Sequence, residues 1–512
     1  MSRVSFHVNM GFWEIINMLV RVASAACLLL SANAFAQNDG LISEESAATA
    51  RELMERGLDS DIGYEVVRSL TTEVGPRLAG SEQEARARDW AVQMFTELGF
   101  ENVRVEPFDM PYWNRGEIDL RIVEPFPQNL FATALGGSAA TPQNGLEREI
   151  AFFDSFEDLR DAPDDGSLQD HIVYVNDRMI SVQTGAGYGP ANRKRQFAWL
   201  EAEARGAAGV IIRSVGTDSH RFPHTGMMST PSARSVSVGS HSQIVIDYLE
   251  SEHPDYETSN VRSSIPAVAV SAPDADQIER IHALGETLTV ELSAVAGWRG
   301  VRQSGNVIAE IPGRELPDEI VLIGAHLDSW DEATGAVDDG AGVGIVTGAA
   351  QLIGQLPRAP RRTIRVVLFG AEEVGLLGAF AYARQNASDV GNIILASESD
   401  FGAGPVWSLT SGTSDEGTLF LDEVQSIIAP LGIIRGDRAN NGGGPDIIPL
   451  AMQGVPVFRL TQDGTDYFDL HHTPDDTFDK IDPDDFAQNV AAWAAVVWLA
   501  ADSDVEFRMR DE

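Results

Sequence analysis

The chain has 512 residues, and its 37 Lys and Arg against 77 Asp and Glu give a formal net charge of −40. A surface of this sign repels nucleic acid and anionic membranes, so neither is expected as the main partner. With 43% hydrophobic and 22% charged residues, the composition is that of a folded chain of two or three domains with a sizeable core.

The first 36 residues have the layout of a secretory signal peptide. An apolar run at residues 22–30 follows Arg21, and Ala34-Phe35-Ala36 places small residues at the two important positions of a cleavage site. The apolar run is too short to cross about 30 Å of hydrocarbon as a membrane anchor. Residues 1–36 are therefore predicted to be removed, and the protein to be exported to the periplasm or the extracellular space.

The single cysteine, Cys27, lies inside this first segment. After cleavage no cysteine remains, so any metal site must use His, Asp and Glu side chains. The longest later apolar run, residues 490–501, predicts a buried helix and is too short to span a membrane.

The next elements predict the first part of a larger domain. Residues 81–98 have helical spacing, with Ser81 and Glu84 at capping-box positions and Gly99 as the C-terminal stop. Residues 101–106 alternate in the manner of a strand.

From about residue 126 the amino-acid composition of the sequence changes. A stretch rich in Gly, Ala and Pro leads to apolar runs at 150–153 and 171–175, a helix at 195–205 and a strand at 209–212. These elements predict a smaller α/β module inserted into the larger domain. The predicted division is residues 37–125 and 298–512 for the two parts of the larger domain, with residues 126–297 as the inserted module.

The second part of the larger domain alternates strands with helices. Strands are expected at 320–324, 363–369 and 393–396, and helices at 340–356 and 376–384. This alternation predicts an α/β fold with a doubly wound, mostly parallel sheet that carries helices on both faces.

Five groups of His, Asp and Glu occur in this second part, most of them directly after an expected strand. Open parallel sheets place their sites at the carboxyl ends of strands. Each group alone has an ordinary interpretation as a capping or solvated loop, but five together favour one metal site. The groups are His326 and Asp328; Asp338 and Asp339; Glu372 and Glu373; Glu398 and Asp400; and His471, His472, Asp475 and Asp476.

The residue types suit such a site. Asp328 follows His326 by two positions, so it can reach that ring or its surroundings and fix the second ring nitrogen. Glycines on both sides of Asp338 and Asp339 let the backbone approach a ligand closely, and one acid can bridge two cations.

The order of these motifs resembles that of the exopeptidases with two co-catalytic zinc ions. The likeness includes Pro223-His224-Thr225-Gly226 and Gly75-Pro76-Arg77-Leu78-Ala79-Gly80-Ser81, so it covers nearly the whole chain after residue 36. It implies the dizinc exopeptidase fold, an inserted module that resembles a protease-associated domain, and a homodimer.

The resemblance also implies two Zn²⁺ per subunit. Asp338 would bridge the two ions. His326 and Asp400 would complete one of them, and Glu373 and His472 the other. These ligands are N and O donors, which suit Zn²⁺.

Further roles follow from the same resemblance. Glu372 matches the general base that takes a proton from a zinc-bridging water and returns it to the departing amine, and Asp328 matches an outer-shell partner. His224, Asp446 and His471 are expected to contact substrate. Pro445 stands where family members usually carry a small hydroxyl residue, which puts the shape of the substrate pocket in question.

The leading hypothesis is an exported zinc exopeptidase that acts on dipeptides or short peptides, and the resemblance favours substrates with a free C-terminus. An aminopeptidase with the same dizinc site is the alternative. A non-catalytic binding ectodomain on this scaffold is a third hypothesis, which the complete ligand set and Glu372 disfavour. The inserted module is either a passive spacer or part of the specificity wall.

Overall fold

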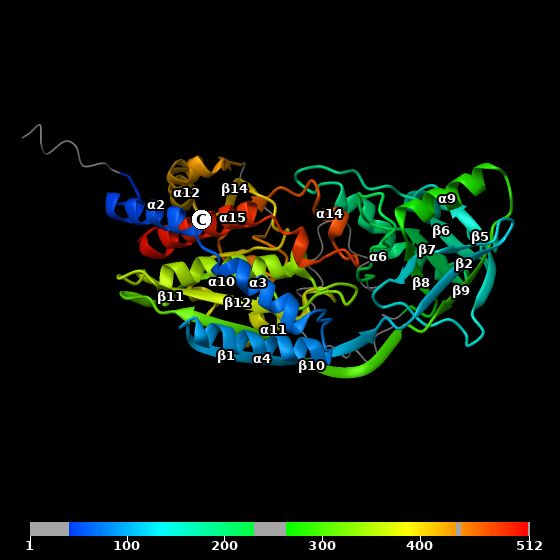
Figure 1. Ribbon diagram of the computed structural model, residues 1–512, viewed down its shortest axis with the longest axis horizontal. Helices are drawn as coiled ribbons and strands as arrows, with labels where there is room; N and C mark the ends of the chain where they lie inside the picture. Colours follow the sequence, from blue (N-terminus) through cyan, green and yellow to red (C-terminus); the bar gives the residue numbers. More distant parts are fainter. Residues whose placement is uncertain (1–39, 230–262, 437–441, 510–512) are drawn as a thin grey trace, which may run out of the picture.

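The computed structural model describes residues 40–229, 263–436 and 442–509. The predicted signal peptide and Cys27 lie outside these residues. The molecule is elongated: one sheet with most of the helices lies at one end of the long axis, and a second sheet lies at the other end (Figure 1).

The first sheet is mixed, with a parallel centre. Its eight strands follow the order β1-β10-β12-β11-β13-β16-β14-β15. The neighbours β12, β11, β13 and β16 are parallel, whereas β1, β10 and β14 join the sheet through antiparallel pairs. The strand bounds are β1 Glu101–Asn114, β10 Gly297–Ile311, β11 Leu316–His326, β12 Arg362–Phe369, β13 Ile393–Glu398, β14 Val406–Gly412, β15 Ile434–Arg435 and β16 Val457–Gln462.

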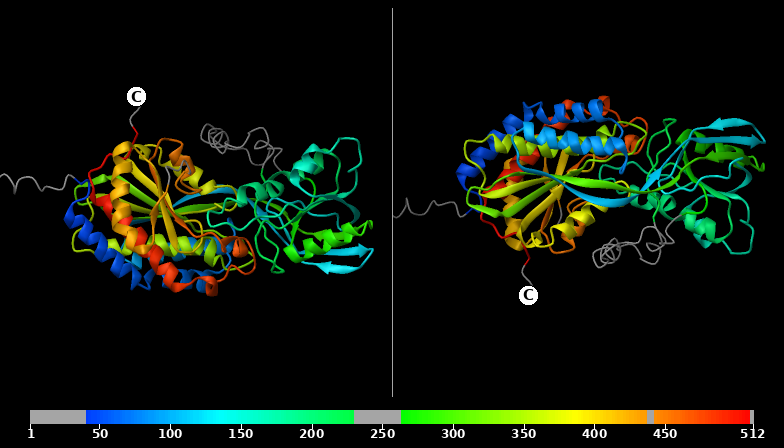
Figure 2. Two further views of the ribbon diagram at one scale, coloured as in Figure 1. Left: turned by 90° about the horizontal axis from the view of Figure 1, so that it is seen from above. Right: turned by 90° about the horizontal axis from the view of Figure 1, so that it is seen from below.

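Helices cover both faces of this sheet, as Figure 2 shows. Alternate residues of β11 face opposite ways: Val321 and Ile323 join one apolar cluster, and Ile320 and Leu322 join another. The predicted doubly wound α/β sheet is thereby confirmed. The helices of the first cluster are α2 Glu44–Leu58, α3 Ile62–Ser69, α4 Glu82–Glu97, α10 Ala341–Gly354, α12 Asp415–Ile428 and α15 Pro483–Asp502, and those of the second are α11 Leu377–Gln385 and α13 Ile448–Ala451.

The second sheet is built mainly from the middle of the chain. Its eight strands follow the order β3-β2-β9-β5-β6-β7-β8-β4, and β5, β6, β7 and β8 are parallel neighbours. The bounds are β2 Ile118–Glu124, β3 Gln128–Leu130, β4 Ala132–Ala134, β5 Leu146–Phe153, β6 Ile172–Val175, β7 Gly209–Arg213, β8 Ala267–Val270 and β9 Thr289–Ala294, with helices α5 Phe156–Asp161, α6 Tyr188–Ala204 and α9 Ala272–Ala283.

Strand β2 lies before residue 126, where the sequence predicts that the inserted module begins, yet it pairs with β9 of the second sheet. The change in composition near residue 126 therefore comes after β2, which ends at Glu124. The three-part division of the chain remains a prediction.

Three expected strands converge on one edge of the first sheet. The parallel strands β11, β12 and β13 end at His326, Phe369 and Glu398, so the residues that follow emerge at the same edge. The predicted helix at residues 490–501 is the buried part of α15. Within the described ranges, no helix combines the length and apolar character needed to cross a bilayer.

Candidate metal centre

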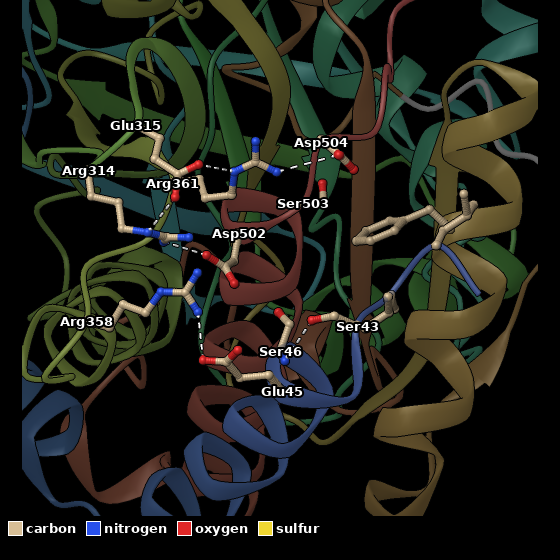
Figure 3. A pocket seen from close by; sticks show the side chains of 13 residues that line it. Ser43, Glu45, Ser46, Arg314, Glu315, Arg358, Arg361, Asp502, Ser503 and Asp504 are labelled. Carbon is tan, nitrogen blue, oxygen red and sulfur yellow. Dashed lines mark hydrogen bonds and ion pairs between the residues drawn. The ribbon is translucent and has the colours of Figure 1, made fainter. Parts of the chain in front are cut away.

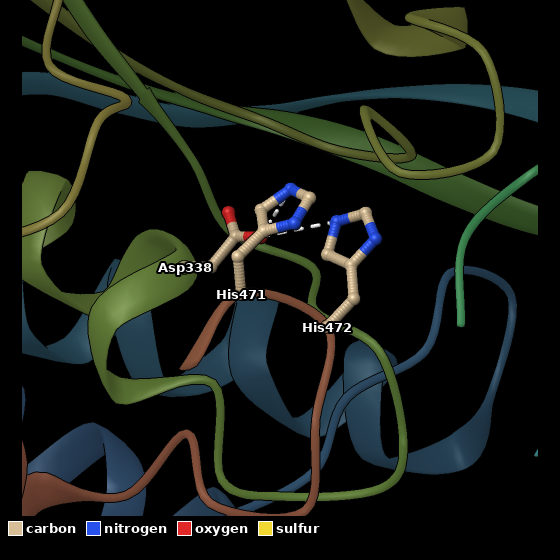
Figure 4. Close-up of side chains that lie close together, drawn as sticks. All are labelled: Asp338, His471 and His472. Atoms are coloured by element: carbon tan, nitrogen blue, oxygen red, sulfur yellow. Dashed lines mark ion pairs between the residues drawn. The ribbon is translucent and has the colours of Figure 1, made fainter. Parts of the chain in front are cut away.

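Two groups of potential metal donors lie at the carboxyl edge of the parallel strands. One consists of His326, Asp338 and Asp400, and the other of Asp338, His471 and His472. Within each group, one donor atom from each residue lies within 4.8 Å of the others. Asp338 belongs to both groups, and Figure 4 shows its carboxylate facing the two neighbouring histidine rings.

The first group is centred on His326, whose side chain is fully buried. Its Nε2 lies 3.1 Å from Asp338 Oδ1 and 3.7 Å from Asp400 Oδ1. Its Nδ1 donates a hydrogen bond of 3.0 Å to the backbone carbonyl of Asp328. Because Nδ1 is taken up by that carbonyl, Nε2 is the ring nitrogen that faces the carboxylates, which is the arrangement of a metal-ligating histidine.

The second group is centred on His472. Its Nε2 lies 2.9 Å from Glu373 Oε2 and 3.1 Å from Asp338 Oδ2. The ring of His471 stacks on that of His472 with centroids 3.5 Å apart, and its Nε2 is 3.6 Å from Asp338 Oδ2. The five ligands implied by the resemblance thus lie together, and His471 lies among them.

The charges in this cluster strongly perturb one another. Burial raises the pKa of Asp338, but hydrogen bonds with His326 and His472 outweigh it and hold the pKa well below its usual value. Burial lowers the pKa of His326, but hydrogen bonds of this ring with Asp338 and Asp400 outweigh burial and hold the pKa well above its usual value. For Glu372, burial raises the pKa well above its usual value, with nearby His326 opposing and Asp400 reinforcing the shift.

The donor set fits metal ions. The Oε1 atom of Glu373 is buried without a hydrogen-bond partner, so one carboxylate oxygen of the cluster has no protein donor. Buried carboxylates are stable when they are paired or when they coordinate a metal. The set contains only imidazole nitrogens and carboxylate oxygens, which suit Zn²⁺.

Asp328 supports the site in a way that its spacing did not reveal. Its carboxylate lies 3.8 Å from the His326 ring, which is too far for a hydrogen bond. Instead, Oδ1 accepts from the backbone N–H of Glu372 at 3.0 Å, and Oδ2 from that of Glu373 at 3.4 Å. Asp328 therefore orients His326 through its carbonyl and both glutamates through its side chain.

We expect Asp328→Ala to lower kcat/KM or zinc affinity by about 10–100-fold, the usual cost of losing an outer-shell partner. The backbone N–H groups of Glu372 and Glu373 would lose their acceptor. Asp328→Asn keeps one acceptor oxygen and should have a smaller effect. Steady-state kinetics and zinc titration measure both, and an alanine variant equal to wild type would contradict this role.

Two further residues hold the loop that carries Asp338. Asp476 was grouped with the candidate donors but given no role, and Arg77 was not named as a site residue. Asp476 accepts from the backbone N–H of Val337 at 2.6 Å and from that of Asp338 at 3.2 Å. Arg77 is fully buried and donates to the carbonyls of three residues of the loop between β11 and α10, which are Leu327, Thr334 and Gly335. Both belong to motifs that carried the resemblance, which was the available sequence indication.

The residues expected to contact substrate are buried. The His224 side chain is 2% exposed. Its Nδ1 lies 2.8 Å from the His471 carbonyl oxygen, and its Nε2 lies 2.8 Å from Asp218 Oδ2. Asp446 is fully buried, and its backbone N–H donates to Glu398 Oε2 at 2.7 Å. Pro445, which precedes it, also lies within the described residues. Substrate contact by these residues remains a prediction.

A cavity of about 330 Å³ lies elsewhere, between α2 and the end of α15 (Figure 3). None of the predicted site residues lines it. Its arginines are already paired: Arg314 with Asp502 at 2.6 Å, Arg358 with Glu45 at 2.9 Å, and a third, Arg361, with Glu315 at 2.9 Å. We therefore place the chemistry at the carboxyl edge of the sheet, where the donors converge.

Comparison with known proteins gives consistent results. The sequence model described as Peptidase family M28 matches residues 306–497. Carboxypeptidase Q of Bos taurus is 33% identical over 86% of this chain and 85% of its own. A crystal structure of a peptidase M28 precursor from Shewanella amazonensis SB2B is similar with a TM-score of 0.83 and 44% identity, covering 92% of this chain and 99% of that one.

A more distant structure shares the fold. The aminopeptidase from Aneurinibacillus sp. strain AM-1 is similar with a TM-score of 0.58 and 21% identity, over 90% of this chain and 98% of that chain.

The doubly wound sheet, with its histidines and carboxylates gathered at one edge, defines a metallopeptidase. More specifically, the chain belongs to peptidase family M28. Carboxypeptidase Q is among its relatives in that family.

Proposed function

We propose that this protein is an exported exopeptidase that binds two Zn²⁺ per chain and hydrolyses dipeptides or short peptides, with a preference for substrates that have a free C-terminus. The observation that carries the proposal is the sharing of Asp338 between two donor groups. One oxygen of the Asp338 carboxylate lies near His326, and the other lies near His472. This arrangement suits a carboxylate that bridges two metal ions.

Two zinc ions held here would supply an acidified water and polarise the scissile carbonyl. His326 and Asp400 would hold one ion together with Asp338, and Glu373 and His472 would hold the other. Glu372 keeps some exposed surface, whereas His326 and Asp338 are buried, so the Glu372 carboxylate can meet substrate. It takes the proton of the attacking water and returns it to the leaving amine.

The carboxypeptidase preference is supported by the relatives. The proteins named carboxypeptidase Q from Bos taurus and Homo sapiens are 33% and 32% identical over 86% of the chain, whereas the named aminopeptidase structure is only 21% identical and shares the fold alone. Export is proposed from the layout of residues 1–36, and a homodimer from the family resemblance. Sequencing the N-terminus of the secreted product and sedimentation of the purified protein test these two points.

Blocked peptides separate the two exopeptidase activities. An N-acetylated substrate should be cleaved with nearly the kcat/KM of the free peptide. A C-terminally amidated one should lose about 10–100-fold, because recognition of a carboxylate is worth about 1.5–3 kcal/mol. Analysis of the released residue by mass spectrometry identifies the end that is cut. The reverse pattern, with amidated peptides cleaved and acetylated ones resistant, would establish the aminopeptidase instead.

A further inference from the structure

The segment that carries His471 and His472 lies against the second sheet's part of the chain. We call residues 463–472 the histidine segment; it contains the short helix α14 (Tyr467–Leu470). Several hydrogen bonds join it to residues 181–225. They are Ser181 Oγ to Thr465 O at 2.6 Å, Gly464 N to Gln183 O at 2.9 Å, Gln183 Nε2 to Asp463 Oδ2 at 2.9 Å, Thr217 N to Phe468 O at 3.2 Å and Thr217 Oγ1 to Asp469 Oδ1 at 2.5 Å.

The most direct contacts reach the two histidines themselves. The backbone N–H of Thr225 donates to the His472 carbonyl at 3.0 Å, and the His472 ring nitrogen Nδ1 lies 3.4 Å from the Thr225 carbonyl. His224 Nδ1 lies 2.8 Å from the His471 carbonyl. Residues 224–225 therefore hold the backbone of both histidines and also face the ring of one.

His224 is itself held rigidly. Its Nε2 lies 2.8 Å from Asp218 Oδ2, and both side chains are almost completely buried, at 2% and 3% exposure. Each ring nitrogen faces an oxygen atom, and these two contacts fix the orientation of the ring. The chain Asp218–His224–His471 carbonyl thus connects the second sheet's part of the chain to the metal centre through buried polar groups.

Arg195 of α6 supports the contact between Thr225 and His472. It donates to the Thr225 carbonyl at 3.2 Å, and its Nη1 is 3.4 Å from Nδ1 of His472. The other ring nitrogen, Nε2, faces Asp338 and Glu373. The guanidinium therefore lies on the side of the ring away from the metal donors, where it supports the ring and its carbonyl partner.

We propose that His224, held by Asp218, is a positioning residue of the metal centre that fixes the His471–His472 backbone, so that the inserted module completes the centre instead of serving as a spacer. This inference rests on the proposed dizinc function. A mere packing interface would bury surface without reaching the donors. Here, the contacts end on the carbonyls of the donor residues themselves, and the histidine segment has no regular strand to hold it in register.

The test compares His224→Ala, His224→Gln and His282→Ala in the full-length protein. His282 is an exposed histidine on α9 of the same module, so its variant is a matched control. Zinc affinity is measured by competition with a chromophoric chelator, and site geometry by the visible absorption of the Co²⁺-loaded protein. Hydrogen–deuterium exchange of the peptide covering residues 463–473 reports local order independently of activity.

We expect His224→Ala to weaken binding of one zinc by about 10-fold or more, alter the Co²⁺ spectrum and speed exchange in residues 463–473, since lost outer-shell support typically costs 10–100-fold. His224→Gln retains a donor for the His471 carbonyl and should partly restore all three readouts. His282→Ala should match wild type. Asp218→Asn, which keeps a neutral acceptor beside His224, gives a milder test of the same support if the alanine variant does not fold.

The possible failures are distinguishable. If His224→Ala and Asp218→Asn bind zinc as wild type does, with unchanged spectra and exchange, the positioning role is overturned while the proposed function stands. The same holds if His282→Ala is equally impaired, since the loss would then be unspecific. If wild type itself binds no zinc, the proposed function fails and this inference fails with it.

Discussion

Glu372→Gln is expected to lower kcat by about 10²–10⁴-fold, the usual contribution of a general acid–base residue, while the protein retains both zinc ions. The amide has nearly the same shape as the carboxyl but cannot accept a proton from water or return one to the leaving amine. Glu372 is partly exposed, and its backbone is held by Asp328, so the substitution should leave the fold and the donor cluster intact.

The adjacent glutamate provides a matched control. Glu373 is buried with Oε2 2.9 Å from His472 Nε2, so Glu373→Gln should weaken zinc binding as well as activity. Zinc analysis with single-turnover kinetics separates the two outcomes. A Glu372→Gln enzyme with wild-type-like kcat would show that another group is the base. A zinc-depleted Glu372→Gln protein would make Glu372 a ligand.

Asp338→Ala is expected to weaken both zinc ions together by at least about 100-fold and to abolish turnover, because ligand loss should cost no less than loss of an outer-shell partner. The reason is its position in both donor groups, within 3.1 Å of His326 on one side and His472 on the other. No other residue in those two groups is shared. Asp400→Ala removes a proposed ligand of one ion only, so the binding affinity for the second zinc ion should stay unchanged.

Zinc titration by calorimetry, with Asp89→Ala as the control, measures this difference. Asp89 is an exposed aspartate on α4, so its substitution removes the same carboxylate from a surface position. If Asp338→Ala still binds one zinc with wild-type affinity, Asp338 is a ligand of a single ion, and the proposed bridge is wrong.

The parallel core of the fold was predictable from the sequence because its signals are local. Buried strands alternate with helices, and the capping residue Ser81 accepts from the Glu84 N–H at 3.0 Å, as its spacing indicates. The antiparallel strands around this core were not placed. Strand β14 pairs with β16 in the first sheet, and β2 pairs with β9 in the second, across long stretches of sequence, so no short-range pattern reports their partners.

The candidate donors were predictable for the same reason. His326 ends a strand, and flanking glycines mark Asp338. What the sequence could not show is how the donors are held. The Asp328 carbonyl bonds the His326 ring, and the Asp328 carboxylate accepts hydrogen bonds from two backbone N–H groups. Contacts that involve backbone atoms cannot be inferred from the residue types in a sequence. The contact between residues 224–225 and 471–472 spans 247 positions and depends on how two sheets meet.

We expect catalysis to depend on two zinc ions at this edge of the sheet. The most direct measurement is dipeptide hydrolysis by chelator-stripped protein, followed during stepwise addition of Zn²⁺. We predict an inactive stripped enzyme whose activity returns and reaches a plateau at two equivalents of zinc per chain. Hydrolysis that persists in the stripped protein would contradict the account.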